Sequence, residues 1–391
     1  MNKNTIATIF LILGVYIFFS GISYLAFAQG GGVPIAKKAE PAPTPKVVGQ
    51  LTFDEKLPKT EACPLSGVKY SKPQKDWWSK HRPLGVMIEN HQASRPQSGL
   101  SFADVVYEAV AEGSITRFLA VFYCQDAGII GPVRSARTYF IDFMSEYGIS
   151  PLYAHVGGAN TSGPANAIGQ LSDYDWSKYN DMNQISDQDL GFPIMVRDYN
   201  RIGHAVDTEH TMYSSTEKLW KVAKDKRKLT NVDEDGKSWD DTFVGYSFKL
   251  DATTRPESQS VHMELWEGYK EYFVDWTYDK VTNTYKRNNG GKPHIDFNNK
   301  KQLTAKNIIV LSMLETNAND GYENNAHLLY KTKGTGKAYI FMDGKQTLGT
   351  WRKSSRTARL MVFDQSGKAI EFNRGVLWFT VLPTDGILTV K

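Results

Sequence analysis

Residues 84–124, LGVMIENHQASRPQSGLSFADVVYEAVAEGSITRFLAVFYC, decide the fold of this chain. Two apolar runs at their ends, Leu84–Glu89 and Ile115–Cys124, have the length and composition of buried strands. Residues 103–110 contain β-branched valines and alternate, which also favours a strand over a helix. We therefore expect three strands in this segment.

Helical patterns follow these strands. Pro132 suits the first position of a helix over about 133–147, whose apolar residues fall on one face. Pro151–Val156 predicts another strand, and a serine cap at 214 or 215 begins a second helix that runs through about Lys226. Strands mixed with helices indicate an α/β or α+β domain.

Beyond the polar stretch 228–242 the pattern becomes mostly β, and turn signals such as Asn289-Gly290 and Asp343-Gly344 separate the apolar runs. The expected strands are Tyr246–Leu250, His262–Glu267, Tyr272–Tyr278, Thr284–Arg287, Ile308–Leu311, Lys337–Met342 and Gly375–Leu382. The prediction is an α+β protein. Its N-terminal mixed α/β domain spans 61–232, and its mostly β C-terminal domain spans 243–391.

The first residues indicate the compartment. Ile6–Ala28 carries no charge, and a helix of this length can cross a hydrocarbon core of about 30 Å. Ala26-Phe27-Ala28 also resembles a signal-peptide cleavage site, so retention and cleavage both stay open. Either alternative exports the chain. We expect a transmembrane anchor or signal segment at 1–28 and a Pro/Gly-rich linker at 29–60.

Composition limits the class of protein. The 391 residues are 41% hydrophobic, which excludes a wholly disordered chain because apolar burial on this scale offsets the ordering entropy. Two cysteines exclude a disulfide-dense scaffold and a four-cysteine zinc site. In an exported chain Cys63 and Cys124 can form one bridge, although Cys124 could equally be a buried thiol. No P-loop, GxSxG or GxGxxG fingerprint occurs, and no cofactor is predicted.

Long motifs resemble one known family. PLGVMIENHQASRPQSGLSFADVVYEAVAEGSITRFLAVF and IGPVRSARTYFIDF are similar to the N-terminal module of the YerB-like family, DUF3048. VDWTYDKVTNTYKRNNGGKPHIDFNNKKQLTAKNIIV and GTGKAYIFMDGKQTLGTWRKSS resemble its C-terminal module, so the resemblance covers about 62–384. It implies an exported bacterial protein on the outer face of the cytoplasmic membrane, often a lipoprotein, and no established reaction. This chain has no lipobox cysteine near residue 28, so a membrane helix would replace the lipid.

Two segments carry candidate anion-binding arginines. Arg134 and Arg137 would share one face at the start of the helix after Pro132, where backbone N–H groups attract anions. The alternative is that both arginines pair with buried carboxylates such as Asp104 or Glu108. The second segment is the loop after the strand that ends at Glu89 and Asn90. There Arg95, Gln97 and Ser98 offer donors, and the alternative is an ordinary loop held by Pro96 and Gly99.

Glu108 and Glu112 could suggest a glycosidase pair, whose carboxyl groups lie about 5–9.5 Å apart. On a strand, residues four apart are separated by roughly 13 Å, so the expected strand argues against this chemistry. One of the two acids could instead balance the arginines, among which Arg117 lies just beyond them.

Histidines supply candidate bases. His204–His210 holds several metal-ligand types but lacks the HExxH spacing, so no metal is predicted. His155 and His210 are the stronger candidates for a general base, because histidine titrates near neutral pH. In the second half, His294 and Asp296 could act together or only stabilise a turn, with Lys306 following. Near Trp351 lies a basic cluster that could touch anionic lipid, or be a solvated surface: Arg352, Lys353, Arg356 and Arg359.

These patterns favour a membrane-anchored, extracytoplasmic cell-envelope protein that binds an anionic ligand or wall polymer. The predicted ligand-binding residues are Asn90, Arg95, Gln97, Ser98, Arg117, Arg134 and Arg137. The alternatives are an envelope hydrolase, with His155, His210 or Glu108 as catalytic group and arginine stabilising negative charge, or a scaffold for envelope enzymes. The expected partners are the cytoplasmic membrane and an envelope polymer or enzyme. Nucleic acid is disfavoured, because the net charge is only +4 and the basic residues are scattered.

Overall fold

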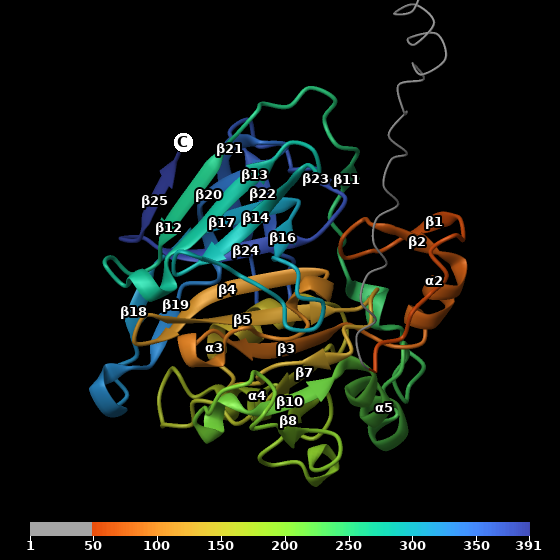
Figure 1. Ribbon diagram of the computed structural model, residues 1–391. Coiled ribbons are helices and arrows are strands. Elements are labelled where there is room, and N and C mark those ends of the chain that lie inside the picture. The colour runs from red at the N-terminus through yellow and green to blue at the C-terminus, as the bar shows by residue number, and fades with distance from the viewer. Residues whose placement is uncertain (1–48) are drawn as a thin grey trace, which may run out of the picture. The chain divides into compact units, whose positions relative to one another are not determined.

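The computed structural model describes residues 49–391, which belong to one compact unit (Figure 1). The predicted membrane segment and most of the linker lie outside the described residues. Within 49–391 no helix has the length and apolar character needed to cross a membrane.

A ten-stranded sheet runs through this unit in the order β22-β21-β20-β17-β24-β4-β5-β3-β7-β8. Both sequence halves contribute to it, and they meet where β24 runs parallel to β4. The first half supplies β3 (Leu84–Glu89), β4 (Val105–Glu112), β5 (Ile115–Phe122), β7 (Leu152–His155) and β8 (Asp181–Asn183). The second half supplies β17 (Asn307–Met313), β20 (Gly334–Met342), β21 (Lys345–Lys353), β22 (Met361–Asp364) and β24 (Leu377–Pro383).

A second sheet and several short strand pairs surround this centre. The second sheet contains β12 (Ser260–Glu264), β13 (Val274–Asp279), β14 (Thr284–Asn289), β15 (Lys292–Pro293), β16 (Thr304–Ala305) and β25 (Ile387–Val390). The short pairings join β1 (Lys59–Ala62) with β2 (Lys69–Ser71), β10 (Met212–Ser215) with β6 (Ile129–Ile130) and β9 (Val196–Arg197), β11 (Phe248–Lys249) with β23 (Phe372–Asn373), and β18 (Glu315–Asn317) with β19 (Leu328–Tyr330).

Both faces of the central strands are covered, which explains their unbroken apolar runs. On one face Tyr107 of β4 stacks on Phe143 of the buried helix α3 (Thr138–Met144), with ring centroids 4.8 Å apart. On the other face Trp378 of β24 meets Trp276 of the second sheet at 5.2 Å. The other α-helices within residues 49–391 are α2 (Lys72–Trp78), α4 (Ala167–Asp173) and α5 (Thr216–Arg227).

The expected α+β class is confirmed, with many strands and few helices. β3 has the predicted bounds, and the strand favoured over 103–110 is present as β4 at Val105–Glu112. α5 begins after its predicted cap, since Ser215 accepts from the Lys218 N–H. The helix expected from residue 133 is wrong in its first turn, because α3 begins only at Thr138.

The chain is extended before α3 because neighbouring strands take its backbone hydrogen bonds. The Arg134 N–H donates to the Met87 carbonyl at 2.9 Å, and the Arg134 carbonyl accepts from the Val156 N–H at 3.1 Å. Arg134 therefore lies between the ends of β3 and β7 and shares no helix face with Arg137.

Candidate functional site

Glu89, the last residue of β3, organises one cluster of predicted site residues. Its carboxylate is buried and contacts two basic side chains: Arg134 Nε lies 3.1 Å from one oxygen, and His210 Nδ1 lies 2.7 Å from the other. The hydrogen bond to Glu89 raises the pKa of His210 above its ordinary value of 6.5. The fold thus brings Arg134 and His210, which are far apart in the sequence, onto a single carboxylate.

This cluster retains unused hydrogen-bonding groups. The two terminal nitrogens of Arg134 and Nε2 of His210 have no hydrogen-bond partner among residues 49–391. The His91 ring stacks on His210 with centroids 4.7 Å apart and planes inclined by 6°. Burial, followed by the neighbouring His210, lowers the pKa of His91 below 6.5. Free donors beside a buried carboxylate could hold an anion or support proton transfer.

Arg117 and Arg137 are used differently. Arg117 pairs with one oxygen of Glu112 at 2.8 Å, and Arg137 pairs with the other. Burial would raise the pKa of Glu112, but the two guanidinium groups dominate and lower it to about 2. Arg134 and Arg137 therefore do pair with carboxylates, as one alternative from the sequence held. The acids are Glu89 and Glu112, respectively, and not Asp104 or Glu108. Arg137, with an exposed fraction of 6%, is a structural ion-pair partner.

Glu108 is fully buried and its cation is Arg287, from the other half of the sequence, at 2.7 Å. Glu108 and Glu112, the suggested glycosidase pair, thus both lie on strand β4, and each forms an ion pair with arginine. The guanidinium of Arg287 also lies over the rings of Phe118, Trp276 and Trp378, at 5.7, 5.4 and 4.8 Å from their centroids.

A closed ring of buried hydrogen bonds extends from this ion pair and joins the two sequence halves. Arg287 Nε donates to His294 Nδ1 at 3.0 Å, and His294 Nε2 donates to Gln97 Oε1 at 2.7 Å. The ring then runs through Gln97, Asn90, Thr116 and Glu108. Burial and Arg287 lower the pKa of His294 well below 6.5, so the neutral ring can accept from one side and donate on the other. Asn90 and Gln97 are thereby structural.

The loop after β3 is clamped by the second half of the chain. The carboxylate of Asp296 accepts from the Gly99 N–H at 3.1 Å and from the Ser101 N–H at 2.8 Å. Ser98 accepts from Arg201 Nε at 2.8 Å. His294 and Asp296 therefore position this loop, a role that goes beyond the turn stabilisation considered from the sequence.

Arg95 is the predicted ligand-binding arginine that lines a cavity of about 540 Å³, formed by this loop, residues 270–271 and the β14–β15 turn. Its guanidinium donates only to carbonyl oxygens: two of Asn90, one backbone and one side-chain, and the backbone carbonyl of Glu271 at 2.9 Å. Burial lowers the pKa of Arg95 to about 10, so the guanidinium stays charged at neutral pH. Lys270 and Lys292 line the same cavity, and sequence reasoning missed both.

His155 is fully buried and both its ring nitrogens are engaged, Nε2 with Asp181 at 2.6 Å and Nδ1 with the Gly157 carbonyl at 2.7 Å. A general base needs a nitrogen that can reach a substrate proton, so His210 is the better placed of the two predicted histidines.

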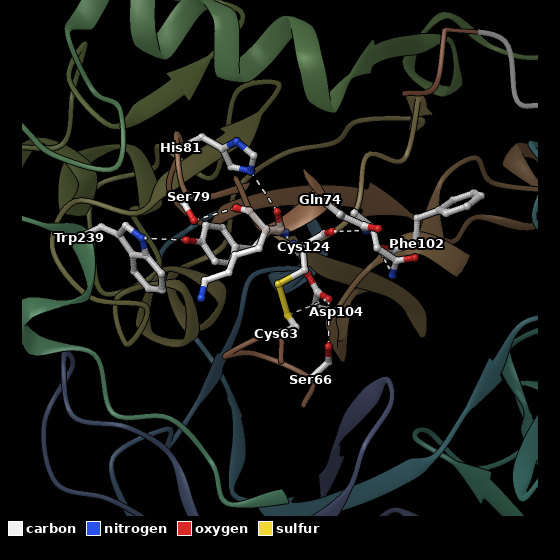
Figure 2. Close-up of a disulfide and its surroundings, with 12 residues drawn as sticks. Cys63, Ser66, Gln74, Ser79, His81, Phe102, Asp104, Cys124 and Trp239 are labelled. Carbon is white, nitrogen blue, oxygen red and sulfur yellow. Dashed lines mark hydrogen bonds between the residues drawn. A yellow bond between two sulfur atoms is a disulfide. The ribbon is translucent and has the colours of Figure 1, made fainter. Parts of the chain in front are cut away.

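Cys63 and Cys124 form a disulfide with Cα atoms 5.9 Å apart, which links the strand end of β5 to the segment after β1 (Figure 2). Asp104 lies beside it and accepts from the Tyr123 and Cys124 N–H groups at 3.0 and 2.9 Å. Burial raises the pKa of Asp104 to about 6, because no cation pairs with it in the described part of the chain.

The basic cluster near Trp351 is largely turned inward. Lys353 and Arg359 pair with the buried Glu146 at 2.9 and 2.8 Å. Arg356 lies over the Tyr174 ring at 3.9 Å. These three cations therefore stabilise the fold, and Lys306 likewise pairs with Asp251.

Comparison with known proteins places the chain in a family. The model described as "Protein of unknown function (DUF3048) N-terminal domain" matches residues 65–230, and the corresponding C-terminal domain matches 261–379. The chain belongs to the DUF3048 family. Among curated proteins, this DUF3048 chain is 26% identical to "Putative lipoprotein YerB" of Bacillus subtilis, over 82% of its own length and 86% of that protein. A crystal structure of YerB from B. subtilis has the same fold, with a TM-score of 0.67 at 24% identity, covering 85% of this chain and all of that one.

Proposed function

We propose that this protein is a membrane-associated cell-envelope protein that binds an anionic ligand, such as a phosphate-bearing wall polymer, in the Arg95 cavity. The lipoprotein name of its Bacillus relative supports an envelope location. Residues 6–28 would then supply a single-pass anchor, with the globular part outside the cytoplasm.

One observation carries the ligand class. Arg95, Lys270 and Lys292 line one cavity, and none of these cations forms an ion pair with a carboxylate of residues 49–391. Glu271 is the one acidic residue in the lining, so positive charge exceeds negative charge there. Arg95 is held by its carbonyl acceptors, which orients the guanidinium before a ligand arrives. A preorganised cation in a concave site favours anions.

The test compares two double variants of the full-length protein in detergent. Lys270→Ala/Lys292→Ala removes two cavity cations, and Lys56→Ala/Lys224→Ala removes two exposed cations elsewhere as a matched control. Calorimetric titration with inorganic phosphate and with purified phosphate-bearing wall polymer should show affinity falling at least about tenfold in the first variant only. Equal binding by both variants, or none by the wild type, would refute the proposal.

A second candidate function is hydrolysis at the Glu89 cluster, and the shared carboxylate favours it. Glu89 orients His210 as a base, and Arg134 could stabilise negative charge that develops beside it. We expect His210→Gln to abolish release of nitrophenol from nitrophenyl acetate or nitrophenyl phosphate, and the matched His155→Gln variant to retain it if folded. Wild-type protein without activity above the buffer rate would remove this candidate.

A further inference from the structure

A second cavity, of about 330 Å³, lies at the tip of the β4–β5 turn against the β18–β19 hairpin. We call it the asparagine cavity. Its lining includes Glu112, Trp266, Asn317, Asn324 and Asn325. It shares no lining residue with the Arg95 cavity.

We propose that the asparagine cavity binds a neutral sugar ring of a glycan. The half-buried Trp266 is held by the hydrogen bond from its Nε1 to Glu315 at 2.9 Å, so the orientation of the indole is set before binding. An indole offers a broad apolar surface on which the C–H face of a sugar can pack. The same Glu315 accepts from the Tyr330 hydroxyl, which braces the arrangement.

The amide groups supply the polar half of the site. The side chains of Asn324 and Asn325 have no hydrogen-bond partner within 49–391, and each amide offers donors and an acceptor. Asn317 is positioned by its bond to the Asn325 carbonyl at 2.8 Å, which leaves its own side-chain oxygen available. Neighbouring sugar hydroxyls both donate and accept, which matches amides better than a cation would.

Charge argues for a neutral ligand. Glu112 is the one charged residue in the lining, and Arg117 and Arg137 already neutralise it from behind. Its carboxylate oxygens can still accept a hydroxyl. Because no cation among the described residues lines this cavity, an anionic polymer gains no ion pair there, in contrast with the Arg95 cavity.

The experiment titrates full-length protein with two neutral probes, tetra-N-acetylglucosamine and maltotetraose, by calorimetry. We expect saturable binding of at least one probe, weakened roughly 3–10-fold by Asn324→Ala and at least about tenfold by Trp266→Ala. Asn319→Ala is the matched control, because Asn319 lies in the same loop with a similar positive φ but outside the cavity lining.

Circular dichroism establishes that each variant is folded, and Trp266→Phe, which keeps an aromatic ring, should restore part of the affinity. The Lys270→Ala/Lys292→Ala protein should bind the neutral probes as the wild type does, which separates this proposal from the anionic one. No saturable binding of either probe by folded wild-type protein overturns the proposal. Unchanged binding by both Asn324→Ala and Trp266→Ala overturns it as well.

Discussion

Arg137 and Arg95 both come from segments that look suited to binding anions, yet they meet opposite surroundings. Arg137 and Arg117 both form ion pairs with the carboxylate of Glu112. The charge of Arg137 is therefore neutralised inside the protein. The Arg95 guanidinium donates only to carbonyl oxygens, lies over the Tyr272 ring at 5.2 Å from its centroid, and lines a cavity with two lysines. The comparison teaches that an arginine becomes a ligand-binding candidate where the fold leaves it without a carboxylate.

Removing a buried carboxylate tests the structural side of this comparison with the largest effect. Glu108→Gln leaves Arg287 buried without a counter-charge, and we expect a loss of about 3–5 kcal/mol in the free energy of unfolding. Urea unfolding followed by circular dichroism measures it. The exposed pair Glu55–Lys59 provides the control, since Glu55→Gln should change stability by less than about 1 kcal/mol. A similarly small loss of unfolding free energy in Glu108→Gln would contradict the structural role of the Glu108–Arg287 pair.

Acid should weaken the Glu112 cluster next. The folded-state pKa of Glu112 is about 2 and its ordinary value is 4.5. The stabilisation is therefore fully present above about pH 4.5 and is lost as pH falls toward 2. The difference amounts to about 3 kcal/mol. Unfolding measured from pH 7 to pH 2.5 should show this loss in the wild type and a shallower loss in Glu112→Gln. Parallel pH profiles would show that the arginines do not depend on this carboxylate.

The cavity lysines should matter for binding and hardly at all for folding. Lys270→Ala/Lys292→Ala removes two exposed side chains without ion pairs, so we expect the free energy of unfolding to change by no more than about 0.5 kcal/mol per substitution. The measurement is urea unfolding without ligand, beside the phosphate titration described above. A large destabilisation would make these lysines structural and erase the contrast with Arg137.

His210 gives the smallest effect. Its folded pKa lies above 6.5, so the stability that charged His210 contributes is complete below about pH 6.5 and is lost as pH rises through the folded value. An NMR titration of the His210 ring should give a midpoint above 6.5, and Glu89→Gln should lower it. A midpoint that Glu89→Gln leaves unchanged would remove Glu89 as the group that tunes this histidine.

Sequence patterns predicted the local elements well. The bounds of β3 follow from its run of apolar residues. The cap of α5 follows from a serine that accepts a hydrogen bond from the backbone N–H three residues later. The same reasoning failed at 133–137, where the backbone of β3 and β7 competes with a helix for hydrogen bonds. It also missed Arg287, which is 179 residues from Glu108 and carries no motif of its own.

The sequence by itself determined many of the strands, though not β21, β22 or β25, together with the α5 helix, the family and an expectation of export, because these depend on neighbouring residues and on long motifs. Only the tertiary structure decided which charges are free. Sequence patterns give Arg134, Arg137 and Arg95 the same predicted role, which is to bind an anion. Their roles diverge because ion pairing depends on distances of about 3–4 Å between groups that come from distant parts of the chain.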